Sequence, residues 1–162
     1  MWKEIDIVDA KLVNPFIDAF ISVMPQIGFP TPKRLKVYLQ NKTLDSHGVL
    51  VMIGFTKQLR GNVVYNMSED TAKFIASTMM MGMPIAEFDE MAQSAISEMA
   101  NMLAANSATN LASLALNVDI SPPSLTIGAN TKVVISDSQF LTVEMDLGGQ
   151  MVKIAVAVDK AQ

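Results

Sequence analysis

Apolar residues recur with two different periods in the first part of the chain. From residue 9 to residue 24 they stand at about helical spacing, which predicts a first helix with Asp9 or Asn14 as its N-cap. Two prolines within residues 28–32 exclude a continuation of this helix. Apolar and polar residues then alternate over residues 35–39, which indicates a half-buried strand.

Two further strands and a capped helix are expected next. The polar stretch Asn41–Ser46 is interpreted as a turn, and the continuous apolar run Gly48–Phe55 predicts a strand that is covered on both faces. A polar connection leads into Gly61–Met67, the returning strand. Ser68 stands at the N-cap position of a helix with an acidic first turn, and we expect this helix to end at Gly82.

The second part of the chain opens with its longest segment free of proline and glycine. This segment runs from Glu87 to about Leu116 and predicts one helix of about 30 residues, about 40 Å long. Pro122 and Pro123 close it. Four strand-like runs follow, with a glycine turn before the last: Ser124–Ile127, Lys132–Ser136, Phe140–Met145 and Met151–Val158.

The order of these elements predicts the fold class. Each half runs from a helix into a group of strands, so we expect an α+β fold of two pseudo-repeated halves, with long helices packed on an antiparallel sheet. The repeat rests on element order alone, because residue identity between the halves is low. No linker stands out, and residues 1–162 are interpreted as a single domain.

The composition of the chain excludes several kinds of catalytic and metal site. The 162 residues include no cysteine and one histidine, so a disulfide framework, a thiolate metal site and a cysteine nucleophile are excluded, and no metal ligands of its own are expected. His47, in the expected polar turn, is interpreted as a solvated residue. The net charge of −4 argues against a nucleic-acid partner. Without a basic leader or an apolar run of about 20 residues, we expect a cytoplasmic protein with no membrane contact.

Two clusters each leave an alternative open. Four of the 13 methionines stand almost together, at Met79–Met81 and Met83; we interpret them as core filling, with an adaptable surface that binds partner helices as the alternative. Acidic residues gather between Glu87 and Glu90, ahead of the long helix, where carboxylates interact favourably with the helix dipole. A metal site is the alternative there.

One face of the long helix carries unusual polar residues. At about 100° per residue, Ser94, Glu98 and Asn101 share this face. A solvated face usually carries paired Lys and Glu, whereas small residues surround this carboxylate and this amide. A capped, solvated helix face is the plain alternative. The apolar residues placed on the opposite side are Ile96, Met99, Leu103 and Leu114, and the small residues beside the polar face are Ala95, Ala104, Ala105 and Ala108.

The spacing of these residues resembles a known signature. Ser94-x3-Glu98-x2-Asn101, followed after twenty-one residues by Pro123, is similar to the signature of the CheC, CheX and FliY phosphatases of bacterial chemotaxis. By length the chain is most similar to the CheX branch. Further resemblance covers nearly the whole chain, through Gly54-Phe-Thr-x3-Arg-Gly61, Met80-Met-Gly-Met-Pro84, Phe88-Asp-Glu-Met-Ala92 and Asp119-Ile-Ser-Pro-Pro-Ser-Leu-Thr-Ile-Gly128.

The resemblance implies an enzyme that removes phosphate from the aspartyl-phosphate of a receiver domain such as phosphorylated CheY. It implies that Asn101 positions the attacking water and that Glu98 pairs with a lysine of the receiver. Ser94 and Pro123 would be supporting positions, and Ala104, Ala105 and Ala108 would form the docking surface. Mg²⁺ would be carried by the receiver, and the alternative is a non-enzymatic module related to flagellar switch components.

Two more expectations follow from the resemblance. CheC has two such signatures, whereas the first helix here offers Asn14, Asp18 and Ile21, with isoleucine where the amide would stand. One active face per chain is therefore implied. CheX-like proteins also pair sheet edges between subunits, so we expect a homodimer through the edges of Phe140–Met145 and Met151–Val158, whose apolar residues would be an aggregation risk if unpaired.

Overall fold

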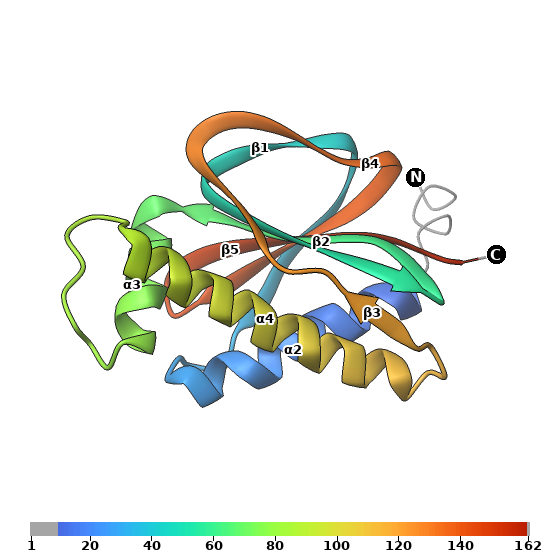
Figure 1. Cartoon of the computed structure of the whole chain (residues 1–162), viewed down its shortest axis with the longest axis horizontal. Helices are drawn as coiled ribbons and strands as arrows, with labels where there is room; N and C mark the ends of the chain where they lie inside the picture. Colours follow the sequence, from blue (N-terminus) through green and yellow to red (C-terminus); the bar gives the residue numbers. More distant parts are fainter. Residues whose placement is uncertain (1–9, 162) are drawn as a thin grey trace.

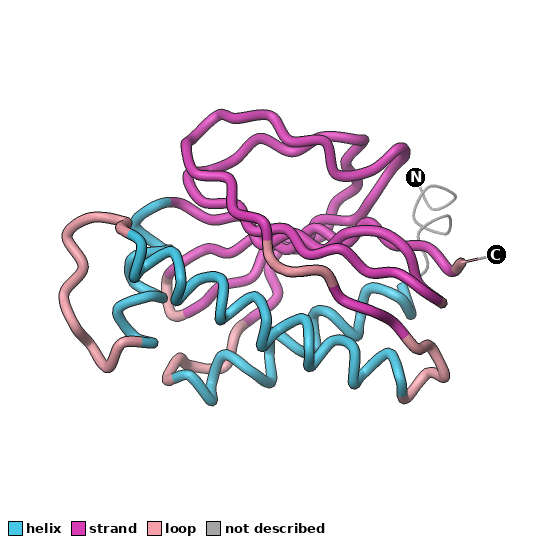
Figure 2. Tube along the Cα trace, viewed as in Figure 1, coloured by secondary structure: helices cyan, strands magenta, loops and turns pink. Residues whose placement is uncertain are grey.

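The computed structural model describes residues 10–161, in which helices lie against one side of an antiparallel sheet (Figures 1 and 2). This arrangement confirms the α+β class. Asp9 lies outside the described residues, and Asn14 is no N-cap because it lies within the first described helix. The elements are α2 (Ala10–Ile27), β1 (Lys33–Lys57), β2 (Leu59–Ser68), α3 (Glu69–Met79), α4 (Glu90–Ala112), β3 (Val118–Ile120), β4 (Ser124–Leu147) and β5 (Gln150–Lys160).

Two very long strands organise the sheet. β1 and β4 have 25 and 24 residues and pair antiparallel along most of their length, from Lys33 opposite Asp146 to Met52 opposite Ser124. The second half of β1 also pairs with β2, β2 pairs with β5, and β5 pairs with the second half of β4. Strand pairing therefore leads from β1 through β2 and β5 to β4, which itself pairs with β1. The two long strands β1 and β4 bend over one face of the sheet (Figure 1).

The turn expected at Asn41–Ser46 and the division of residues 124–145 into three separate strands were both wrong. Asn41–Ser46 belongs to β1, and the runs 124–127, 132–136 and 140–145 all belong to β4. The ladder between the two strands continues through three irregularities, one of them between Asn41 and Thr43. Lys42 has φ 63°, so the strand bends there without losing its partner. Local bulges thus replace chain-reversing turns.

The sheet is covered on both faces, as predicted for Gly48–Phe55. Alternate residues of this segment face the helices and join the main core with α2 and α4 (Val49, Val51, Ile53, Phe55). Leu50 points to the other face and packs in a second, smaller core beneath the bent arms of β1 and β4. Ile135 in the β4 arm enters this second core, and its carbonyl accepts from Asn62 Nδ2 at 2.9 Å.

Side-chain caps mark where α3 and α4 begin, and both helices end earlier than predicted. Ser68 caps α3 as predicted, since its Oγ accepts from Thr71 N at 3.1 Å, but α3 stops at Met79, three residues before Gly82. α4 is shorter than predicted at both ends. Asp89 is its N-cap and accepts from Ala92 N at 3.0 Å, so Glu87 lies outside the helix. At its end the backbone reverses through Ala115, at φ 60°.

The pseudo-repeat appears in the order and lengths of the elements. The first half runs α2, β1, β2 and the second α4, β4, β5, with long strands of 25 and 24 residues and short strands of 10 and 11. Phe140–Met145 and Met151–Val158 do not supply free edges. β5 lies between β2 and β4, and this part of β4 lies between β5 and β1. The stated reason for a homodimer was therefore wrong.

The packing of α2 on the sheet predicts a large effect of one core substitution. The Phe16 ring of α2 is fully buried and meets Phe55 of β1 edge to face at a centroid distance of 5.2 Å. We expect Phe16→Ala to lower the free energy of unfolding by about 3–5 kcal/mol, measured by urea titration. Leu114→Ala, at a side chain that is 50% exposed, should change it by less than about 1 kcal/mol. Equal values for the two variants would contradict this packing.

Candidate functional site

The outer face of α4 presents the three polar residues of the signature together. Ser94, Glu98 and Asn101 are all exposed. The opposite stripe, Ile96, Met99 and Leu103, is fully buried in the main core. Glu98 and Asn101 are three residues apart, so their Cβ atoms lie about 5–6 Å from each other on the surface of the helix. The predicted common face is confirmed.

α4 holds these side chains on a rigid support. Its N-terminus is closed by the Asp89 cap, and α2, α3, β1, β3 and β4 all contact the helix. Among residues 10–161, the side chains of Glu98 and Asn101 make no hydrogen bond or ion pair. A carboxylate and an amide therefore point from a fixed helix into solvent with their bonding capacity unused.

The packing of α4 buries one of the small residues around its polar face and leaves others accessible. Ala105 is exposed and Ala108 is half-buried, so both remain beside the polar face. Ala104 is fully buried in the main core and cannot belong to a docking surface, which corrects that prediction. It stands about 90° round the helix from the face centre, on the flank that packs inward. Leu114, expected on the buried side, is 50% exposed beyond the helix end.

Pro123 lies outside the helix, in the segment that joins β3 to β4. It is half-buried and precedes the first residue of β4. Ser121 anchors this segment to β1, because its backbone N–H donates to Gly54 O at 2.9 Å and its Oγ accepts from Gly54 N at 2.7 Å. β3 and β4 contact α4, so the segment that carries Pro123 passes beside the helix (Figure 1).

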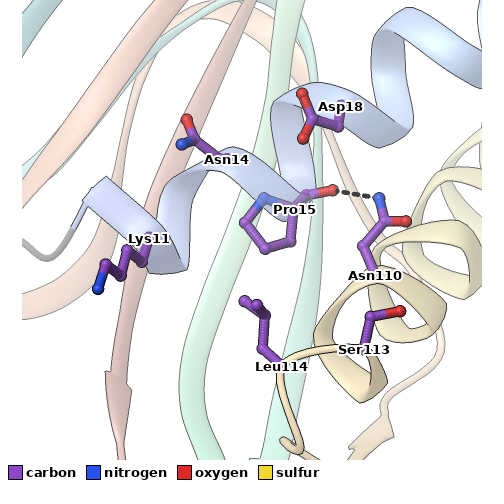
Figure 3. Close-up of a pocket in the computed structure, with 7 residues that line it drawn as sticks. All are labelled: Lys11, Asn14, Pro15, Asp18, Asn110, Ser113 and Leu114. Carbon is purple, nitrogen blue, oxygen red and sulfur yellow. Dashed lines mark hydrogen bonds between the residues drawn. The ribbon is translucent and has the colours of Figure 1, made fainter.

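The corresponding positions on α2 line a different kind of site. Asn14 and Asp18 face a cleft between α2 and the end of α4 (Figure 3). The Asn110 side chain bridges the two helices there, with its Nδ2 donating to the carbonyl oxygen of Pro15 at 2.9 Å. Ile21 packs against the main core. The position that corresponds to Asn101 is therefore occupied by Ile21 and carries no amide, although Asn14 of the same face is exposed.

Other polar groups do not assemble into a second centre of the same kind. In residues 10–161 no group of three or more His, Asp or Glu side chains could hold a metal ion, and Asp89 serves as a helix cap. His47 lies in β1 rather than in a turn, and lines a polar pocket on the sheet face opposite the helices. Partial burial and the nearby Lys153 ammonium lower the pKa of His47, while burial and Glu144 raise the pKa of Tyr38.

The methionine cluster fills the core only in part. Met79 packs against the main core, but Met81 is 98% exposed and Met83 is 52% exposed in the connection between α3 and α4. A further exposed methionine, Met91, stands one turn before Ser94 on α4 and was missed by the sequence interpretation. Because Met91 stands three residues before Ser94, helical spacing alone would have placed the two side chains next to each other.

Comparison with known proteins identifies the family. The family model for chemotaxis phosphatase CheX matches residues 49–146, which include all of α4 and the segment with Pro123. The chain belongs to this family. It is therefore an enzyme, a phosphatase, which agrees with the resemblance and not with the non-enzymatic alternative. None of the helices within residues 10–161 is long and apolar enough to cross a bilayer.

Individual relatives agree with this assignment. The CheY-P phosphatase CheX of Thermotoga maritima is 33% identical over 126 residues, which cover 78% of this chain and 81% of that protein. A CheC-like superfamily protein from Shewanella sp. PV-4 superposes with a TM-score of 0.83 at 21% identity over 94% of this chain and 99% of the other. CheX from a Borrelia burgdorferi complex with CheY, BeF3 and Mg²⁺ gives a TM-score of 0.74 at 26% identity over 91% and 97%.

Proposed function

We propose that this CheX family member hydrolyses the aspartyl-phosphate of a CheY-type receiver domain in chemotaxis signalling. The observation that carries the proposal is the pair Glu98 and Asn101, exposed and unpaired on one face of a rigid helix. The names of two relatives support it. One is a CheY-P phosphatase, and the other occurs in a complex with CheY, BeF3 and Mg²⁺, in which BeF3 stands in for a phosphoryl group. A receiver substrate places the activity in the cytoplasm.

Asn101 is proposed to position the attacking water. Phosphoryl transfer proceeds through a loose in-line transition state, so catalysis depends on positioning and charge stabilisation. The amide oxygen accepts a hydrogen bond from the water and the amide NH₂ donates one, which orients the nucleophile without early removal of its proton. The water oxygen attacks phosphorus, the bond to the aspartyl oxygen breaks, and inorganic phosphate leaves with the water's protons.

Glu98 is proposed to set the register of the bound receiver. It lies one turn before Asn101 on the same face, so a receiver lysine paired with its carboxylate would lie beside the phosphoryl group. A charge pair enclosed in an interface fixes orientation more strongly than an exposed one. Ser94 and Pro123 are proposed as supporting positions, and the receiver supplies the Mg²⁺ that neutralises charge on the phosphoryl oxygens.

Substitution of the two polar residues tests this mechanism. We expect Asn101→Ala to lower the rate of phosphate release from a phosphorylated CheY-type receiver by about 100-fold, because the water loses its orientation. Glu98→Gln should chiefly raise KM, because the charge pair is lost while the side-chain size is kept. Release is followed by a phosphate-binding fluorescence assay with Mg²⁺ present.

The control for these variants is another asparagine of the same helix. Asn106 stands about 140° round α4 from Asn101 and is half-buried. Asn106→Ala should therefore hydrolyse the substrate within about twofold of the wild-type rate, because this position faces away from the receiver. Wild-type rates in both Asn101→Ala and Glu98→Gln would overturn the mechanism.

The small side chains of Ala105 and Ala108 are proposed to let the receiver approach Asn101 closely. Ala105 stands one turn after Asn101 and is exposed, and Ala108 follows on the same face. A tryptophan at 105 would hold the receiver away from Asn101, so Ala105→Trp should lose most of the activity and the affinity for BeF3-activated receiver, with an unchanged melting temperature. Affinity is measured by titration calorimetry, with Ala105→Ser as the control expected to bind normally.

We also propose a homodimer, formed through strand edges other than Phe140–Met145 and Met151–Val158. In the described part of the chain, residues 33–41 of β1 and residues 124–136 of β4 pair on one side only. Their exposed apolar residues include Leu35 at 51% and Val134 at 69%. We infer that these edges pair between subunits, since long unpaired apolar edges promote association.

Light scattering tests the dimer. We expect a mass near two chains for the wild type and near one chain for Val134→Lys, because an edge lysine opposes strand pairing. Ser22→Lys is a control for added charge, since its side chain is exposed and polar and lies on α2, outside both edges. A wild-type mass of one chain would remove the dimer.

A further inference from the structure

An exposed apolar surface lies at the N-terminal end of the catalytic helix. Met81 and Met83 in the α3–α4 connection and Met91 on α4 are 98%, 52% and 59% exposed; we call these three residues the methionine patch. Figure 2 shows the connection projecting beyond the two helices it joins. A hollow beside α4 is lined by Met83 and Met91 together with Pro84 and Ile85. Isolated exposed apolar residues are ordinary, but Met83 and Met91 border one hollow and Met81 lies in the same connection as Met83, and such a group marks an interaction site.

Hydrogen bonds to the end of α3 hold this connection. The backbone N–H of Gly82 donates to Ser77 O at 2.8 Å, and Ser77 Oγ donates to Met83 O at 2.8 Å. Met81 immediately precedes Gly82, in the loop that these two bonds close, and has φ 60°, in the left-handed region that long side chains disfavour. The backbone thus holds the Met81 side chain in solvent. Both the positive φ of Met81 and the exposure of its apolar side chain are unfavourable in the free protein.

The patch is continuous with the face that carries Glu98 and Asn101. Met91 precedes Glu98 by seven residues, which is two turns, so both side chains point the same way about 10 Å apart. A standard interface buries about 800 Å² on each partner, equivalent to a disc of about 16 Å radius. A receiver centred over Glu98 and Asn101 would therefore reach Met91 and the neighbouring connection.

We propose that the methionine patch is a second contact surface for the phosphorylated receiver, which binds an apolar area beside the receiver's phosphorylation site and sets substrate affinity rather than the chemical rate. This inference rests on the proposed function. Methionine side chains suit the role because they are flexible and polarisable and adapt to a partner's shape. None of the three side chains reaches the phosphoryl group, so they contribute to KM and not to kcat.

Exposed carboxylates around the patch disfavour other occupants. Glu87, Asp89 and Glu90 are exposed beside it. An anionic membrane surface would be repelled by these carboxylates. A second copy docked on the same patch about a two-fold axis would place the same carboxylates against one another. The receiver is the favoured occupant, because Met91 shares the α4 face that carries Glu98 and Asn101.

The test compares two sets of Met→Gln or Leu→Gln substitutions in the full chain. The patch variant is M81Q/M83Q/M91Q, which keeps side-chain length and removes apolar surface. The control variant is L114Q/M151Q, at exposed apolar residues of 50% and 38% away from α4's polar face. Each is assayed for steady-state hydrolysis of phosphorylated receiver and for affinity to BeF3-activated receiver.

We expect the patch variant to raise KM and to weaken receiver affinity about tenfold, with kcat unchanged, while the control variant behaves as the wild type. A wild-type KM and affinity in the patch variant would overturn the inference, and so would a loss of kcat alone. Loss of vesicle binding or of dimer mass in the patch variant, with receiver affinity unchanged, would instead assign the patch to a membrane or a second copy and would also overturn it.

Asn101→Ala in the same assay separates this inference from the proposed function. If the wild type releases no phosphate from the receiver, the proposed function fails. If the wild type is active and Asn101→Ala is slow while the patch variant keeps wild-type KM, only the methionine patch fails. Because all three methionines are exposed, melting temperature by circular dichroism should be unchanged in the patch variant.

Discussion

The burial of one stripe of α4 is the constraint on which the site depends. Ile96, Met99 and Leu103 are fully enclosed between the sheet and the neighbouring helices, and this fixes the rotation of α4 about its axis. With that rotation fixed, Glu98 and Asn101 can only face outward. The Asp89 cap sets where the helix begins. A catalytic amide needs such a support, because a misplacement of about 1 Å costs about 100-fold in rate.

The chemistry of the site is divided between two proteins in the proposed reaction. This chain has no cysteine and one histidine, and that histidine lies on the sheet face away from the helices. It contributes a carboxylate and an amide on a rigid surface, and the receiver contributes the phosphoryl group and its metal. Recognition is then as important as chemistry. This explains how an exposed face with small residues, rather than a deep pocket, can serve an enzyme.

Much of the fold followed from local patterns, and the exceptions share a cause. The Ser68 cap, the doubly covered strand at 48–55 and the common face of Ser94, Glu98 and Asn101 depend on short-range spacing. The turn expected at 41–46 and the division of residues 124–145 into three strands were wrong, because β1 and β4 stay paired with each other through bulges. A polar, bulged strand and a turn have the same local composition, and only the partner strand distinguishes them.

The sequence by itself determined the α+β class, the amphipathic helix and the gapped signature, because each depends on residues whose spacing along the chain fixes their relation in space. Tertiary structure alone decided which flank of α4 is covered, and so removed Ala104 from the surface and left Ala105 on it. It also paired both sides of 140–145 and 151–158 and exposed Met81. Burial is a property of what packs against a residue, and that partner lies far away in the sequence.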